Sequence, residues 1–220
     1  MGQLKGKTYT LPVGSAKVEL ISADDSILSE RVGRGIEFEP QSRRLWAEWC
    51  AKGGMVLDVG AYTGLFAIGA VKLGCYAISF EPMPFNAERV AKNARLNGVE
   101  FVQMQAALSD RNGEIEITYN PKTPFFTSGA SLVRKKGSKL TVKTLTIDSL
   151  KLPQVTAIKI DVERGEPFVL RGARETLARC RPMMLVEALG MDERNAVMDA
   201  VDDYDLVDVI DVRNLVLAPC

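Results

Sequence analysis

One short segment places a carboxylate beside two glycines. Residues 57–64 have the sequence LDVGAYTG, in which an apolar strand-like run leads into a turn and an apolar helix-like run. Gly60 and Gly64 let the backbone approach a ligand closely. The D-x-G-x-x-x-G spacing differs from the G-x-G-x-x-G of pyrophosphate sites, and the carboxylate of Asp58 favours a cationic or amine-bearing ligand. Taken alone, the segment also fits a tight turn that binds nothing.

A second carboxylate follows at the spacing of a nucleoside site. Glu81 ends the next predicted strand, 23 residues after Asp58. An acidic residue at this point can accept hydrogen bonds from both ribose hydroxyls of an adenosine. A lone glutamate before a helix would be an ordinary surface residue, but the two acids in this order favour a nucleoside ligand.

Further acidic residues follow the later strands, where a proton could be transferred. Asp161 comes directly after the predicted strand 157–160, and period-two alternation puts Lys159 and Asp161 on one face. A nearby lysine can set the pKa of an aspartate or orient an acceptor, so Asp161 is the candidate general base. Glu163 is the alternative base, and Glu187 could complete an acidic cluster. A structural ion pair between Lys159 and Asp161 is the competing interpretation.

The amino-acid composition excludes several kinds of catalytic and metal-binding site. The chain has no histidine, which excludes Ser-His-Asp and Cys-His catalysis and metal sites with imidazole ligands. Asp161, Glu163 and Glu187 could hold a divalent cation, but ordinary carboxylates at a polar cleft are the favoured interpretation, and no metal site is predicted. The cysteines show no CxxC pair and are expected to be free thiols in a reducing cytoplasm: Cys50, Cys75, Cys180 and Cys220.

Size and charge favour one globular domain that binds a small molecule. The 220 residues are 46% hydrophobic and 25% charged, which is typical of a folded soluble protein. The 28 basic and 28 acidic residues balance, which argues against a general electrostatic grip on nucleic acid or on an anionic membrane. The most apolar window, 55–71, is short for a membrane span, and the N-terminus lacks the apolar core of a signal peptide. We therefore expect a cytoplasmic protein.

Alternating segments predict an α/β fold with crossover helices. The predicted strands are 55–59, 77–80, 99–105, 157–160 and 183–186. The predicted helices are 62–73, 84–96, 167–179 and 192–201. Residues 108–119 are expected to form a hairpin around the sequence DRNG. Two terminal strands, 205–210 and 215–217, lack a crossover helix, which predicts one antiparallel strand near the sheet edge.

Two parts of the chain are less regular. Residues 1–54, with short strands at 17–21 and 36–38 and a helix that starts at Pro40, are expected to form an N-terminal extension that could cover the cleft, ahead of a main domain at 55–220. Residues 121–140 lack periodicity and include Phe125 and Phe126; they predict either an acceptor-side loop or a disordered bulge. The basic run 134–139 fits a solvated face better than a site for an anionic acceptor.

The motifs together resemble the FkbM family of S-adenosylmethionine-dependent methyltransferases. The resemblance covers roughly Glu39 to the C-terminus and rests on VLDVGAYTG, FEPMPFNAERVAKNARLNGV, AALSDRNGEIEI, GASL, LTIDSL, IKIDVERGEPFVLRGARETLARCRP and MLVE. It implies a Rossmann-like class I methyltransferase fold: a mixed seven-stranded sheet with helices on both faces. It also implies S-adenosylmethionine as cofactor, bound at the carboxyl ends of the parallel strands.

The resemblance also implies roles for individual residues. The cofactor-binding residues would be Asp58, Gly60, Ala61, Tyr62, Gly64, Glu81, Pro82, Ala106 and Ala107. Asp58 would face the methionine amino group through water, Glu81 would take the ribose hydroxyls, and Ala106 and Ala107 would flank the adenine. The catalytic residues would be Lys159, Asp161, Glu163 and Glu187.

This sequence departs from the family pattern in two places. The family usually has D-V-E-G-x-E, whereas here Arg164 precedes Gly165. The family often has a histidine shortly after the glutamate of the last strand, whereas Ala188 and Leu189 follow Glu187 here. The expected activity is methyl transfer to a hydroxyl of a sugar or other small molecule. The alternatives are a nucleic-acid methyltransferase, an inactive cofactor-binding or scaffold protein, and a nicotinamide-dependent oxidoreductase.

Overall fold

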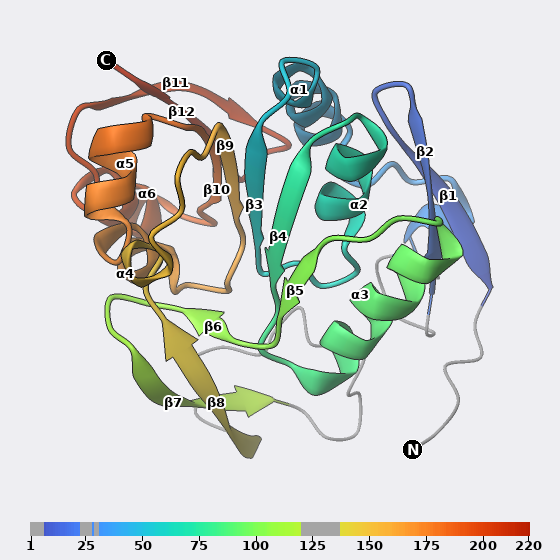
Figure 1. Ribbon diagram of the computed structural model, residues 1–220, viewed down its shortest axis with the longest axis horizontal. Coiled ribbons are helices and arrows are strands. Elements are labelled where there is room, and N and C mark those ends of the chain that lie inside the picture. The colour runs from blue at the N-terminus through green and yellow to red at the C-terminus, as the bar shows by residue number, and fades with distance from the viewer. Residues whose placement is uncertain (1–6, 23–27, 29–30, 120–136) are drawn as a thin grey trace.

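The computed structural model describes residues 7–22, 28, 31–119 and 137–220. Seven of its strands form one mixed sheet in the order β11-β12-β10-β9-β3-β4-β5 (Figure 1). Their bounds are β3 Met55–Val59, β4 Tyr76–Phe80, β5 Val102–Met104, β9 Ala157–Ile160, β10 Met183–Glu187, β11 Tyr204–Ile210 and β12 Asn214–Pro219. Five strands run parallel, and β12 is antiparallel to both of its neighbours. The predicted seven-stranded sheet with one antiparallel strand near its edge is confirmed.

The sheet is buried on both faces because neighbouring residues of a strand point to opposite sides. Val56 and Leu185 belong to one hydrophobic cluster, whereas their neighbours Leu57 and Met184 belong to another. The first cluster includes side chains of α1 (Pro40–Cys50) and α2 (Leu65–Lys72). The second includes side chains of α4 (Glu166–Arg171), α5 (Arg174–Cys180) and α6 (Met191–Met198). Helices cover both faces, as predicted.

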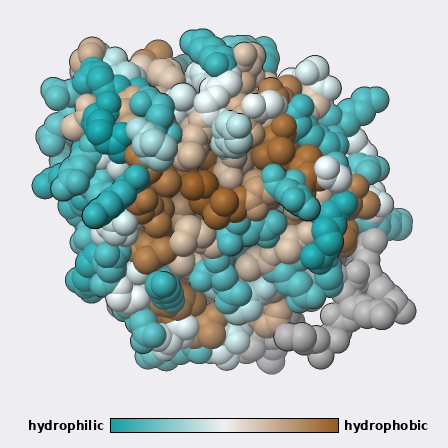
Figure 2. All heavy atoms as spheres, viewed as in Figure 1, coloured by the Kyte–Doolittle hydropathy of each residue, from teal (hydrophilic) through white to brown (hydrophobic). Residues whose placement is uncertain are grey.

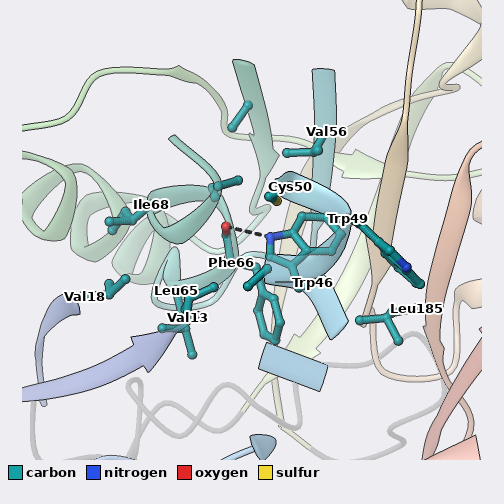
Figure 3. Packing of buried hydrophobic residues seen from close by; sticks show 14 of the residues in the cluster. Val13, Val18, Trp46, Trp49, Cys50, Val56, Leu65, Phe66, Ile68 and Leu185 are labelled. Atoms are coloured by element: carbon teal, nitrogen blue, oxygen red, sulfur yellow. Dashed lines mark hydrogen bonds between the residues drawn. The ribbon is translucent and has the colours of Figure 1, made fainter. Parts of the chain in front are cut away.

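The N-terminal part packs into the first cluster. Strands β1 (Thr8–Val13) and β2 (Ala16–Ile21) form an antiparallel hairpin, which lies against α2 and α3 (Pro84–Leu96). In α1, the indole of Trp46 donates a hydrogen bond to the carbonyl of Phe66 at 3.1 Å, and the two rings meet edge to face (Figure 3). Both sides of residue 54 therefore share one core, and the division there remains a prediction. The strand expected at 36–38 is wrong, because these residues lie in a bend between the 3₁₀ turn Val32–Arg34 and α1.

A second, small sheet replaces the hairpin expected at 108–119. Strands β6 (Ala107–Leu108) and β7 (Gly113–Tyr119) do not pair with each other; both pair with β8 (Ser138–Leu145), which lies between them (Figure 1). The physical reason is side-chain burial: Ile115 and Ile117 face Val142 and Leu140 of β8 across the antiparallel pair. Local alternation identified β7 but not its distant partner.

Three predicted boundaries are corrected by backbone geometry. The helix expected at 167–179 is two helices, which are separated at Gly172 and Ala173. At Gly172 the backbone packs so closely on Ser109 that an added Cβ would lie 2.0 Å from its carbonyl oxygen. The helix expected from residue 62 begins at Leu65, because Tyr62 and Gly64 have φ of 51° and 79°. The strand expected at 99–105 shrinks to β5.

Polar and apolar side chains are unevenly distributed on the face that Figure 2 draws. Figure 2 shows hydrophilic side chains around the margins of this face and a band of hydrophobic ones across its middle. In the part of the chain that the structure describes, no helix combines the length and the apolar character needed to cross a bilayer. Most of the predicted acceptor-side loop, including Phe125, Phe126 and the basic residues 134–136, lies outside the described residues. Lys139 of the basic run forms an exposed ion pair with Glu116.

Candidate active site

A cavity of about 420 Å³ opens at the carboxyl ends of β3, β4, β9 and β10. This is the size of a small-molecule site and the place where open α/β sheets bind their ligands. Of the predicted site residues, the following line it: Asp58, Gly60, Ala61, Tyr62, Glu81, Pro82, Ala106, Ala107, Lys159, Asp161, Glu163 and Glu187. Gly64 does not. It begins α2 in a left-handed conformation, and an added Cβ there would lie 3.0 Å from the side chain of Val90.

The turn after β3 is held so tightly that it accepts only glycine at one point. Gly60 has φ of 81°, and an added Cβ would lie 1.8 Å from the carbonyl oxygen of Asp161. The amides of Gly60 and Ala61 both donate to the carbonyl of Phe80, at 2.9 and 3.0 Å. The turn is thus fixed between β4 and the segment after β9, with its backbone facing the cavity.

Asp58 has a structural contact as well as a place in the cavity wall. Its Oδ2 accepts a hydrogen bond from the amide of Ala67, in the first turn of α2, at 3.0 Å. Burial raises the pKa of Asp58 to about 6, although the Lys159 ammonium and the Ala67 amide oppose that rise. Asp58 therefore stabilises the start of α2, and its carboxylate also contributes negative charge at the cavity wall.

Glu81 is fixed by backbone amides on both sides. Its Oε2 accepts from the amide of Tyr62 at 2.8 Å, and its Oε1 accepts from the amide of Met83 at 2.9 Å. Burial raises the pKa of Glu81 to about 7, against these hydrogen bonds. Arg89 lies close by, with its guanidinium 4.5 Å from the centre of the Tyr62 ring. The Asn86 side chain also hydrogen-bonds with Glu81, so three protein groups hold this carboxylate at the cavity wall.

The other end of the cavity brings three carboxyl groups together. One carboxylate oxygen from each of Asp161, Glu163 and Glu187 lies within 4.8 Å of the other two. Lys159 Nζ lies 3.0 Å from Asp161 Oδ2, as strand alternation predicts, and 4.8 Å from the centre of the Phe66 ring. The predicted residues Lys159, Asp161, Glu163 and Glu187 therefore lie close together, while their roles remain predictions.

Burial and neighbouring charges together set the pKa values of these three carboxyl groups. Burial opposes ionisation of Asp161, but the Lys159 ammonium, a hydrogen bond with Glu187 and the Arg213 guanidinium together outweigh it and lower the pKa of Asp161. Burial and then the Asp161 carboxylate raise the pKa of Glu163 to about 8, and the same two causes raise the pKa of Glu187. Asp161 is therefore the carboxyl group of the three that holds its negative charge most firmly.

Two residues of this end were missed from the sequence. Glu39, directly before α1, is buried, and its Oε1 accepts from Arg213 Nη2 at 3.3 Å. Arg213 Nε lies 3.1 Å from Glu187 Oε1. Neither residue lies in a local motif, since Arg213 sits in the turn between the last two strands. The Glu39–Pro40 helix start was the one local signal that could have drawn attention to Glu39.

The loop that contains Arg164, where this chain departs from the family pattern, has an unusual backbone conformation. Glu163 and Arg164 both take left-handed conformations, with φ of 57° and 78°. Glu166 holds this loop, since its Oε1 accepts from the amides of Val162 at 2.9 Å and Arg164 at 3.3 Å. Arg164 Nε also lies 3.1 Å from Glu193 Oε1. An arginine thus occupies a backbone conformation that glycine adopts more easily.

The part of the chain that forms most of this site matches a known protein family. Residues 58–213 match the family model described as the methyltransferase FkbM domain. The chain belongs to the FkbM methyltransferase family. The resemblance seen in the motifs is thereby confirmed. The segment that matches the FkbM model contains Asp58, Glu81 and the acidic residues around Asp161, so both ends of the cavity fall within it.

This FkbM chain is similar in sequence to a named methyltransferase and in fold to solved structures. It is 28% identical over 167 residues to the hexuronic acid methyltransferase AglP of Haloferax volcanii, covering 74% of this chain and 67% of that protein. An FkbM methyltransferase of Methylobacillus flagellatus KT has a TM-score of 0.52 at 17% identity, over 76% of this chain and 43% of that one. The tRNA (uracil-54, C5)-methyltransferase of Pyrococcus abyssi, in complex with S-adenosyl-L-homocysteine, has a TM-score of 0.52 at 15% identity, over 96% of this chain and 43% of that one. These structures share the fold, and this FkbM chain spans less than half of each.

Proposed function

We propose that this chain transfers a methyl group from S-adenosylmethionine to a hydroxyl oxygen of a sugar or another small molecule. The observation that carries the proposal is a single cavity with two chemically different ends. One end has the Gly60 turn and Glu81, and the other has the acidic residues around Asp161. The name of the relative AglP, a hexuronic acid methyltransferase, supports a sugar as the acceptor.

The residues at the first end fit the cofactor. Gly60 lets the turn pack against the carbonyl of Asp161 beside the cavity, and Glu81 offers two oriented carboxylate oxygens to the ribose hydroxyls. Asp58 adds negative charge for the amino group of the methionine part. S-adenosylmethionine supplies a methyl group that its sulfonium centre already activates, so the protein has to supply alignment and a proton acceptor.

In this proposal, Asp161 accepts the proton of the acceptor hydroxyl. As the oxygen forms its new bond to the methyl carbon, the O–H bond breaks and the proton passes to a carboxylate. Lys159 holds the Asp161 carboxylate in position through the 3.0 Å contact, and Glu163 is the second candidate for the same role. Glu187 lies close enough to share the proton with Asp161.

Turnover with a panel of sugars tests this function. The chain is incubated with S-adenosylmethionine and neutral, amino and acidic sugars, and mass spectrometry follows methylated sugar and S-adenosylhomocysteine. Equal amounts of the two products support the proposal. Binding of S-adenosylmethionine without turnover across the panel favours a binding or scaffold protein. Tight binding of NAD without S-adenosylmethionine binding, or methylation of RNA in place of sugars, contradicts it.

A further inference from the structure

The acidic end of the cavity contains more carboxyl groups than the cations beside it can neutralise. Among the described residues there, four carboxyl groups belong to Glu39, Asp161, Glu163 and Glu187. Two cations form ion pairs with them: Lys159 with Asp161, and Arg213 with Glu187 and Glu39. These six groups have a formal charge of −2 when all of them are ionised. A divalent cation would favour this fully ionised state.

The distances suit an ion with oxygen ligands. The three oxygens of Asp161, Glu163 and Glu187 lie within 4.8 Å of one another. Oxygen ligands held at about 2.1–2.5 Å from a central ion lie within about 4–5 Å of one another. Two of the ligands come from the segment after β9 and the third from the end of β10, so neighbouring parallel strands fix their spacing.

A separate observation comes from Glu39. Its side chain is 95% buried in the cavity wall, and its Oε2 has no hydrogen-bond partner within the part of the chain that the structure describes. Its other oxygen is joined to Glu187 through the guanidinium of Arg213. A buried carboxylate oxygen without a partner is destabilising, so such an atom normally has a ligand, a water or an ion to contact.

We propose that Asp161, Glu163 and Glu187 form a binding site for Mg²⁺ or Mn²⁺, with Glu39 Oε2 accepting a hydrogen bond from a water molecule of the ion. This site goes beyond the proposed function. Hard divalent cations of this kind prefer carboxylate oxygens, and the chain has no histidine to select a softer metal. Lys159 and Arg213 orient the ligands from outside. An ion here would lower the pKa of a hydroxyl group that it contacts.

Titration with Mn²⁺ alone tests the site without cofactor or acceptor. The tag-free full chain is stripped with EDTA, desalted and titrated, while electron paramagnetic resonance measures the free ion. We expect one Mn²⁺ per chain, with a Kd of about 10⁻⁴ M or tighter, and displacement by Mg²⁺. No binding by the folded wild-type chain up to about 1 mM Mn²⁺, or binding that Mg²⁺ cannot displace, overturns the proposal.

Charge-neutral variants locate the ion. Glu163→Gln and Glu187→Gln should each weaken Mn²⁺ binding at least about tenfold, and Glu39→Gln should weaken it less. Glu88→Gln, at an exposed pair with Lys92 on α3, is the matched control and should bind like the wild type. Wild-type affinity in Glu163→Gln, which changes a partly exposed loop residue, would place the ion elsewhere and overturn the proposal. Methylation that proceeds in EDTA by a chain that binds no Mn²⁺ would overturn the site and leave the proposed function standing.

Discussion

At the scale of single residues, Asp161 carries the proposed proton transfer. Asp161→Asn keeps the size of the side chain and an oxygen for Lys159, but the amide cannot accept the proton. We expect kcat to fall about 10²–10⁴-fold while the affinity for S-adenosylhomocysteine is kept. Calorimetry and product formation measure the two effects separately. Asp202→Asn, at an exposed position away from the cavity, is the control. Equal turnover by Asp161→Asn and the wild type would remove the assignment.

Glu81 should make nucleoside binding depend on pH. Burial raises its pKa to about 7, and only the ionised carboxylate accepts from both ribose hydroxyls. Protonation below this pKa weakens binding, so affinity rises with pH. If the carboxylate alone binds, a one-proton titration gives about a tenfold gain in adenosine affinity between pH 6 and pH 8. Calorimetry across this range measures it.

Glu81→Gln is the control for that titration. Glutamine cannot lose a proton, so the pH dependence assigned to Glu81 should disappear and the affinity should stay low. Asp58, whose pKa is raised to about 6, also borders the cavity. A slope that persists unchanged in Glu81→Gln would assign the titration to Asp58 or another group.

At the scale of elements, the turn after β3 depends on its contact with the segment after β9. In Gly60→Ala, the new methyl group would lie 1.8 Å from the carbonyl oxygen of Asp161, so the turn or the end of β9 must move. We expect loss of cofactor binding and a clear fall in Tm. Gly53→Ala is the matched control, because Gly53 has φ of 72° but nothing within 4 Å of its added Cβ. It should cost about 1 kcal/mol from backbone strain alone and keep binding.

The loop after β9 stores strain at Arg164. Glycine should relieve the left-handed backbone there by about 1 kcal/mol, whereas the exposed ion pair with Glu193 contributes about 0–1 kcal/mol. Arg164→Ala loses the ion pair without relieving the backbone, so Arg164→Gly should be about 1 kcal/mol more stable than Arg164→Ala. Urea unfolding of both variants measures the difference. Equal stability would mean that the surrounding contacts, such as those of Glu166, remove the strain.

At the scale of the whole molecule, we expect the N-terminal part to unfold together with the main sheet. Trp46 and Trp49, the two tryptophans of the chain, both lie in α1 and belong to the cluster that includes Val56 and Leu185 (Figure 3). Tryptophan fluorescence therefore reports on the N-terminal part, and far-ultraviolet circular dichroism reports on all helices and strands. Coincident urea transitions are expected. Two separate midpoints would instead show that residues 1–54 form an independent unit.

The sequence determined the sheet, and all but one of the site residues that it predicted line the cavity. Apolar runs identify the strands, and a glycine or an acidic residue marks the end of several of them. These residues are Asp58 with Gly60, Glu81, Asp161 and Glu187. Because parallel strands end at the same edge of a sheet, residues that follow those strands meet without any knowledge of packing. Glycine at residue 60 was likewise visible, since a turn between a strand and a helix limits the choice of residue.

The tertiary structure alone decided which distant side chains complete the site. Arg213 lies 174 residues from Glu39, and their contact depends on where α1 and the last two strands pack. The partner of β7 is likewise β8, beyond a long intervening segment, and not the nearby β6. Local patterns record the conformation of neighbours in the chain, whereas these contacts arise from burial between elements far apart in sequence, so no spacing rule encodes them.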